Sequence, residues 1–361
     1  MKLIHRLGCV LLALASPLSQ AQSDLAVGDV LDTPAMPVAQ AERAVFIDLA
    51  RAGVRLVAVG ERGLILLSDD HGQSWRQASV PVSVGLTAVQ FADARHGWAV
   101  GHAGVILATR DGGESWQLQL DGRQAAQLEL EAAQRDLDDA LDVDAAEARL
   151  QAAERLKEEG PDKPLLALAF TDVRHGLVVG AYGLAFRTAD GGATWHSVIG
   201  QIANPMGLHL YAIARQGQHW FLAGEQGYLA RSLDDGRSFE ELDSPYSGTF
   251  FTLANGQDGS LVVAGLKGHA FVSHDRGDSF APLPGRVPIS FNQAIRLHDG
   301  RVGCSSRATR CAALSIVSGP SRKRGSAVLR AGRRQTRSRA RSSPMAKGLA
   351  TKSSAPRSSA M

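Results

Sequence analysis

Carboxylates and hydroxyls recur together at a fixed spacing, and this arrangement is the one in the sequence that could carry chemistry. The motif is Ser/Thr-x-Asp-x-Gly-x-Ser/Thr-Trp/Phe, and its first copy occupies residues 68–75. A carboxylate beside two hydroxyls resembles a general acid–base or nucleophilic site. A catalytic group is needed only once in an enzyme, whereas this motif occurs five times. Its Asp, Gly and aromatic members are Asp70, Gly72, Trp75, Asp111, Gly113, Trp116, Asp190, Gly192, Trp195, Asp234, Gly236, Phe239, Asp275, Gly277 and Phe280.

The repetition favours a structural role for these fifteen residues. The Asp side chain can accept hydrogen bonds from the N–H groups of a turn. The Gly permits a positive φ, and the aromatic ring can be buried against a neighbouring sheet. We therefore predict that the motif builds hairpin turns, and that it contains no catalytic residue and no metal ligand.

A second pair of glycines extends each copy of the motif into a longer unit. The first Gly stands fifteen positions before the aromatic residue, and the second follows three positions after the first. The first glycines are spaced by 41, 79, 44 and 41 residues. Each unit holds four short apolar runs, which in the second unit are residues 86–91, 97–100, 105–109 and 116–120. About 41 residues with four strands is typical of a β-propeller blade, so we predict an all-β propeller of six to seven blades, the last ones disrupted.

The spacing of 79 indicates an insertion, which we place at residues 121–164. Residues 124–159 are rich in helix formers, and the first Gly and Pro after them are Gly160 and Pro161. Leu130, Leu137 and Leu141 would share one helix face. A break at residues 142–144, with Asp144 and Glu147 as a capping box, predicts a helical hairpin. The hairpin is either a solvated excursion or an arm that binds a partner.

The first 21 residues resemble a secretory signal peptide. Lys2, His5 and Arg6 precede an apolar run over residues 7–15, and small residues allow cleavage after Ala21. Cys9 would be the alternative, as a lipoprotein site, but it stands too early in the segment. The expected order is therefore a signal peptide (1–21), a leader (22–43) and the propeller (44–300) of a periplasmic or secreted protein.

Charge separates the propeller from the last 61 residues. Residues 301–361 contain fifteen Lys or Arg and no Asp or Glu, which leaves a net charge of −12 in residues 1–300. An acidic body argues against nucleic-acid binding. The sixth unit begins normally near residue 291 and then loses its pattern. We predict a frameshift near residues 301–306, which would make 301–361 a low-complexity product; the alternative is a genuine basic tail.

The eight-residue motif is the Asp-box, or BNR, repeat found in sialidases and several other propellers. With Val-Gly-x-x-Gly in front of it, the unit over residues 44–300 resembles the photosystem II stability/assembly factor family. That resemblance implies an exported seven-bladed scaffold without enzymatic activity or cofactor. It also implies a protein partner, expected to be a subunit of a membrane complex, and no small-molecule substrate. The arginine-rich binding patch of the family has no sequence motif that we can map onto this chain.

Single residues suggest two other functions. A sialidase-like glycoside hydrolase would need a Tyr paired with a Glu, and Tyr246 is the most irregular Tyr, although no Glu is tied to it by spacing. An Arg-x-Pro sequence occurs only late, at residues 286–288. The histidines lack the spacing of metal ligands. We therefore place partner binding in the parts that are not repeated, namely the arm at 124–159 and the loop at 204–209.

Overall fold

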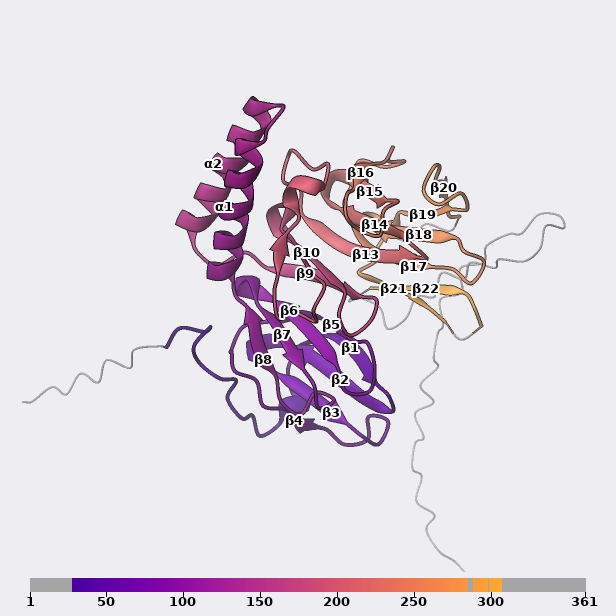
Figure 1. Cartoon of the computed structure of the whole chain (residues 1–361). Coiled ribbons are helices and arrows are strands. Elements are labelled where there is room, and N and C mark those ends of the chain that lie inside the picture. Colours follow the sequence, from indigo (N-terminus) through magenta and orange to yellow (C-terminus); the bar gives the residue numbers. More distant parts are fainter. Residues whose placement is uncertain (1–27, 285–287, 298, 307–361) are drawn as a thin grey trace, which may run out of the picture.

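The computed structural model describes residues 28–284, 288–297 and 299–306, and within them it contains five four-stranded antiparallel sheets and one two-stranded sheet (Figure 1). The five full sheets follow chain order as a meander, which confirms the predicted propeller blades. Their strands are β1 Phe46–Ala52, β2 Arg55–Gly60, β3 Ile65–Ser68 and β4 Arg76–Gln77; β5 Leu86–Phe91, β6 Gly97–Gly101, β7 Ile106–Thr109 and β8 Gln117–Leu120; β9 Leu165–Phe170, β10 Gly176–Gly180, β11 Ala185–Thr188 and β12 His196–Ser197; β13 Leu210–Gln216, β14 His219–Gly224, β15 Leu229–Ser232 and β16 Glu240–Glu241; β17 Phe250–Asn255, β18 Leu261–Gly265, β19 Ala270–Ser273 and β20 Ala281–Pro282. The sixth sheet pairs β21 Gln293–Arg296 with β22 Val302–Ser305.

Blades pack face to face, because side chains alternate between the two faces of every strand. Val57 and Leu67 of the first blade share one buried cluster with Ala99, Leu107 and Trp116 of the second blade. The other face of the second blade supplies Trp98 and Ile106 to the next cluster. Each blade is thus apolar on both faces, and the core lies between blades.

The inner strands β1, β5, β9, β13, β17 and β21 contact one another in sequence around the axis. In each of the five full blades the inner strand has a β-bulge at its second residue, which is skipped by the pairing to the next strand. A bulge re-aims the side chain that it carries. The bulged residues are Ile47, Thr87, Leu166, Tyr211 and Phe251.

The two ends of the blades form two different faces. Because successive strands are antiparallel, the turns after the first and third strands lie at one end, and the turns after the second and fourth lie at the other. We call the first end the box face, because it carries the five Asp-box hairpins. We call the second end the linker face. It carries the connections between blades and the short 3-10 turns η2 Glu61–Gly63, η3 His102–Gly104, η4 Ala181–Gly183, η6 Glu225–Gly227 and η7 Leu266–Gly268.

In each repeat the first glycine ends the second strand and the second glycine ends the 3-10 turn, and each position requires glycine for a different physical reason. The first Gly lies against the inner strand: a Cβ on Gly180 would come within 2.3 Å of the Pro164 carbonyl oxygen, and the four equivalent glycines are as close to the equivalent carbonyl. The second Gly has a positive φ, which is 72° at Gly183.

The insertion is an arm of two helices, α1 Gly122–Asp138 and α2 Val143–Glu159, that projects from the linker face beside the third blade (Figure 1). Asp121 caps α1, since its carboxylate accepts the N–H groups of Arg123 and Gln124 at 2.9 Å. The predicted cap of α2 is wrong: Asp142, not Asp144, accepts the N–H of Ala145, because the helix begins two residues earlier than expected.

The predicted leucine face of the arm is also wrong in part. Leu141 lies in the turn between the helices and is fully exposed. The buried stripe of α1 is formed instead by small residues, which allow the helix to lie close to β12 and to the 3-10 turn η5 Ile199–Gln201; they are Ala125, Ala126, Ala132 and Ala133. Among the described helices none is long and apolar enough to cross a membrane.

The leader follows the linker between the first two blades. Its described part includes the 3-10 turn η1 Ala41–Arg43. Ala35 donates its N–H to the Val80 carbonyl at 3.1 Å, and Ser83 donates to the Val30 carbonyl at 2.9 Å. The expected signal peptide and its cleavage site, and the last 55 residues to which the frameshift hypothesis refers, lie outside the described residues.

A seam separates the first blade from the two-stranded sheet. Gln293 of β21 donates to the carboxylate of Asp48 across it at 3.4 Å. A cavity of about 370 Å³ beside this contact is lined by Leu49, Ala58, Leu66 and Trp75. In the other full blades the equivalent face packs against the preceding blade, whereas no full blade of the described chain covers this face of the first blade.

Candidate functional site

The five Asp-boxes form one hydrogen-bonded turn, repeated with the same partners. In the first box Ser68 donates its hydroxyl to the Asp70 carboxylate at 2.8 Å and accepts the N–H of Gly72 at 2.7 Å. Ser74 donates both its N–H, at 2.9 Å, and its hydroxyl, at 2.6 Å, to the same carboxylate. The other four boxes repeat this set around Asp111, Asp190, Asp234 and Asp275.

The box carboxylates accept these hydrogen bonds in their ionised form. The hydroxyl and the N–H of Thr194 hold the pKa of Asp190 at about 2, and those of Ser279 do the same for Asp275. A carboxyl group that takes up a proton near neutral pH needs a pKa above its ordinary value instead. The geometry is therefore consistent with the prediction that the boxes have a structural role. The box glycines all have a positive φ, between 77° at Gly236 and 92° at Gly113.

The aromatic residue that closes each box is buried between blades, with two exceptions. Trp116, Trp195 and Phe239 are each 4% exposed. Trp75 and Phe280 are only half-buried. Trp75 belongs to the open face of the first blade, which explains its exposure.

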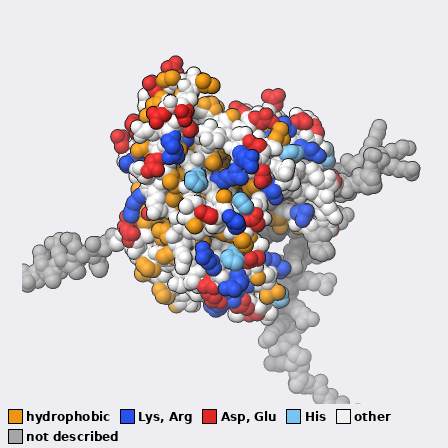
Figure 2. Space-filling view, viewed as in Figure 1, with side chains coloured by type: hydrophobic (Ala, Val, Ile, Leu, Met, Phe, Trp, Pro, Cys, Tyr) orange, Lys and Arg blue, Asp and Glu red, His pale blue; other side chains and the backbone are white. Residues whose placement is uncertain are grey.

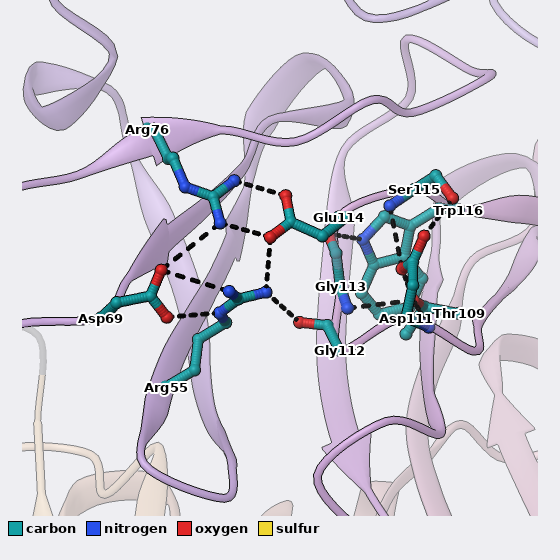
Figure 3. A network of polar contacts seen from close by, with 10 residues as sticks. All are labelled: Arg55, Asp69, Arg76, Thr109, Asp111, Gly112, Gly113, Glu114, Ser115 and Trp116. Carbon is teal, nitrogen blue, oxygen red and sulfur yellow. Dashed lines mark hydrogen bonds and ion pairs between the residues drawn. The ribbon is translucent and has the colours of Figure 1, made fainter.

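Charged side chains join the first blade to the box of the second, and sequence reasoning did not anticipate this network (Figure 3). Arg55 binds both carboxylate oxygens of Asp69, at 2.6 and 3.2 Å, and also donates to the Gly112 carbonyl at 3.0 Å. Glu114 bridges Arg55 and Arg76. Between the fourth and fifth blades Arg231 donates in the same way to the Arg276 carbonyl at 3.0 Å. These arginines already make ion pairs and hydrogen bonds within the propeller, so they are poor candidates for partner contacts.

The histidines and the tyrosine considered from the sequence also have contact partners within the propeller. His96 and His175 each lie 2.9 Å from the Asp three residues earlier, in equivalent turns. Tyr246 stacks on His269 with ring centroids 4.0 Å apart, and it also contacts Phe250 and Phe271. A Tyr packed among other rings is poorly placed to act as a nucleophile on a glycoside.

A buried ion pair joins the two helices of the arm, and a hydroxyl of the third blade binds to it. Arg149 of α2 binds both oxygens of Glu129 in α1, at 2.9 and 3.1 Å, and the Glu129 side chain is 4% exposed. Ser197 of β12 donates its hydroxyl to the same carboxylate, and Asp136 also pairs with Arg149. At the base of the arm Arg123 pairs with Asp29 and Asp32 of the leader. The arm therefore has a defined orientation on the propeller.

The loop at 204–209 lies directly against the turn η4 of the third blade. Asn204 accepts the N–H of Leu208 at 2.9 Å, which closes the loop. His209 accepts the N–H of Tyr182 at 3.1 Å and joins the loop to the turn. Met206 and Tyr182 are 70% and 57% exposed. The structure thus gathers the loop, η4 and the base of the arm on one part of the linker face.

Comparisons with known proteins agree with this architecture. A sequence profile described as Photosynthesis system II assembly factor YCF48 matches residues 67–138 and 151–248. A Photosystem II assembly lipoprotein Ycf48 from Synechococcus sp. (strain CC9902) is 29% identical over 117 residues, which cover 32% of this chain and 35% of that relative. The chain thus spans about a third of the length of this curated relative.

Solved structures show the same fold at low identity. YCF48 bound to D1 peptide superposes with a TM-score of 0.50 and 16% identity, over 73% of this chain and 76% of that one. An ancestral GH74 enzyme gives a TM-score of 0.52 at 9% identity, over 76% of this chain and 37% of that one.

The fold and the repeated turns define the class as an Asp-box β-propeller with a helical insertion. Within that class, the profile match and the curated relative show a Ycf48-like chain, similar to photosystem II assembly factors.

Proposed function

We propose that this chain is a non-enzymatic, exported scaffold that binds a protein partner and aids the assembly or stability of a membrane complex. The profile match over residues 67–138 and 151–248 carries the proposal. The occupied box carboxylates support it, because the repeated polar residues hold turns together and leave function to the parts that are not repeated. The first ligand to test is a segment of the photosystem II subunit D1, since a YCF48 of the same fold was solved with a D1 peptide.

The test is recovery of a membrane-complex subunit, or of a D1 peptide, by the purified full chain. The structure offers a matched variant without the arm. Gly122 and Pro161 lie side by side at its base, since a Cβ on Gly122 would be 2.8 Å from Pro161, so residues between them can be replaced by a short Gly linker. Loss of binding in this variant assigns the contact to the arm. Equal recovery excludes the arm, and recovery of no partner by the full chain refutes the proposal.

The glycoside hydrolase alternative is tested separately with fluorogenic glycosides. Turnover that disappears in Tyr246→Phe would revive it. The ring contacts of Tyr246 lead us to expect no turnover in either protein.

Export is proposed from the amino-terminal sequence. Mass spectrometry of the mature chain distinguishes the two routes. Cleavage after Ala21 leaves an amino terminus at Gln22, whereas lipidation would leave one at Cys9. The curated relative is named a lipoprotein, which makes the second route worth measuring.

A further inference from the structure

Four aromatic rings form a continuous row on the linker face. Tyr182 and His209 have centroids 4.8 Å apart, His209 and Tyr211 6.2 Å, and Tyr211 and Phe251 5.2 Å. The row starts at the turn η4 of the third blade and crosses the inner strands of the fourth and fifth blades. All four rings are exposed or half-buried. We call these four residues the aromatic row.

The propeller repeat does not require these rings. The turn position of Tyr182 holds a different kind of residue in each other full blade, namely Arg62, Ala103, Gln226 and Lys267, all with φ between 54° and 56°. Tyr211 and Phe251 occupy bulge positions that are Ile47, Thr87 and Leu166 in the other blades. The left-handed conformation belongs to the turn in every full blade, so it does not require an aromatic residue at this position. The row is therefore specific to this part of the molecule.

The polar groups of the row suit a cation. His209 accepts the Tyr182 N–H through Nδ1. Glu225 lies 3.5 Å from His209, and burial together with the charge of Glu225 raises the pKa of Tyr211. The Lys163 ammonium, which also pairs with Glu159 and Asp162, lies 5.4 Å from the centre of the Tyr182 ring, within the range of a cation–π contact.

The arm beside the row adds negative charge. Residues 121–159 contain twelve acidic and five basic residues. Leaving aside the acids paired with Arg149, Arg123 and Lys163, the described arm still exposes eight acidic side chains and only three basic ones. Figure 2 shows these acidic side chains over the projecting helices. A basic segment approaching the row is attracted by this field, whereas an acidic one is repelled.

We infer that the aromatic row, with Glu225 and the acidic arm beside it, is the docking surface for a basic, extended segment of a protein partner. Lys or Arg side chains of that segment stack on the tyrosine rings, with Glu225 as their counter-ion. This inference rests on the proposed function, and it adds the chemistry of the partner and the place where it binds.

The test uses three fluorescein-labelled peptides of one Gly-Ser-Pro background that differ only in carrying four Lys, four Gln or four Glu. Fluorescence anisotropy with the full chain should show tightest binding by the Lys peptide. Tyr182→Ala should weaken that binding roughly fivefold or more, as loss of one cation–π contact predicts. This variant should fold, because Ala103 holds the same turn position with a φ of 56°. Gln226→Ala, at the same position outside the row, is the matched control and should bind like the unmodified protein.

Glu225→Gln provides a second, independent variant and should also weaken binding of the Lys peptide. Preference for the Glu peptide, or unchanged affinity in both Tyr182→Ala and Glu225→Gln, would overturn the inference. Either result leaves the proposed function standing if a membrane-complex subunit is still recovered. Conversely, absence of any recovered subunit refutes the proposed function even where the Lys peptide binds to the row.

Discussion

The buried ion pair between the two helices of the arm gives the sharpest stability prediction. Arg149→Ala removes the guanidinium that occupies both oxygens of Glu129, whose side chain is 4% exposed. Removing one partner of a buried pair costs about 3–5 kcal/mol, because the other charge stays buried without its counter-ion. Ser197 remains as a hydrogen-bond donor to Glu129, and the Arg149 side chain is 15% exposed. We therefore expect the lower end, about 3 kcal/mol.

A loss of that size concerns the packing of α1 against α2 rather than the fold of the blades. It corresponds to roughly a hundredfold increase in the population of arms whose helices have separated. Hydrogen exchange measured by mass spectrometry should report faster exchange across α1 and α2, with unchanged rates in β13–β15. Arg155→Ala is the control, since Arg155 is an exposed residue of the same helix. Exchange in Arg149→Ala that matches the control would refute the reasoning. Replacing Glu129 and Arg149 together by Leu should restore slow exchange, because no charge is then left unpaired.

Three further predictions concern the propeller itself. Gly180→Ala should lower the free energy of unfolding by about 1–3 kcal/mol in denaturant titrations, because a main-chain carbonyl lies where the Cβ would be; a change under about 0.5 kcal/mol would contradict the close approach. Trp75→Ala should destabilise the chain less than Trp116→Ala, for which about 3–5 kcal/mol is expected, since only Trp116 is buried between two blades. Finally, the pKa values of Asp190 and Asp275 are about 2 in the folded chain and lie below the ordinary value; their contribution to stability is complete above about pH 4 and should be lost as the pH falls toward 2, so a melting temperature that stays constant from pH 5 to pH 2 would exclude it.

The repeats made the blades predictable from the sequence. In the second unit the predicted strands end within one residue of the observed ones, because the boundaries coincide with Gly, Asp and Ser turns. The Asp-box contacts follow from spacing alone, since all partners lie within six residues. The family was also identified from the spacing of glycines and box residues, as the profile match confirms.

Contacts between blades could not be predicted in the same way. Arg55 and Gly112 are 57 positions apart, and nothing in either local sequence indicates that they meet. The aromatic row could not be predicted either, because it joins residues of three blades that are distant in the sequence. In the arm, helix propensity predicted two helices, but the register of the buried stripe depended on Ala residues that carry no strong signal, and the leucines misled the assignment.

The seam changes how the molecule should unfold. A propeller whose ring is closed by a full interface unfolds as one unit, whereas a row of repeats that contact only their neighbours behaves like a one-dimensional array. Among residues 28–284, 288–297 and 299–306, one side-chain hydrogen bond crosses the seam, between Asp48 and Gln293, which are 245 positions apart. Such an array loses structure from its ends inward, so the first blade and the two-stranded sheet should fray before the third and fourth blades. The blades that carry the arm and the aromatic row are then the most cooperative part of the chain.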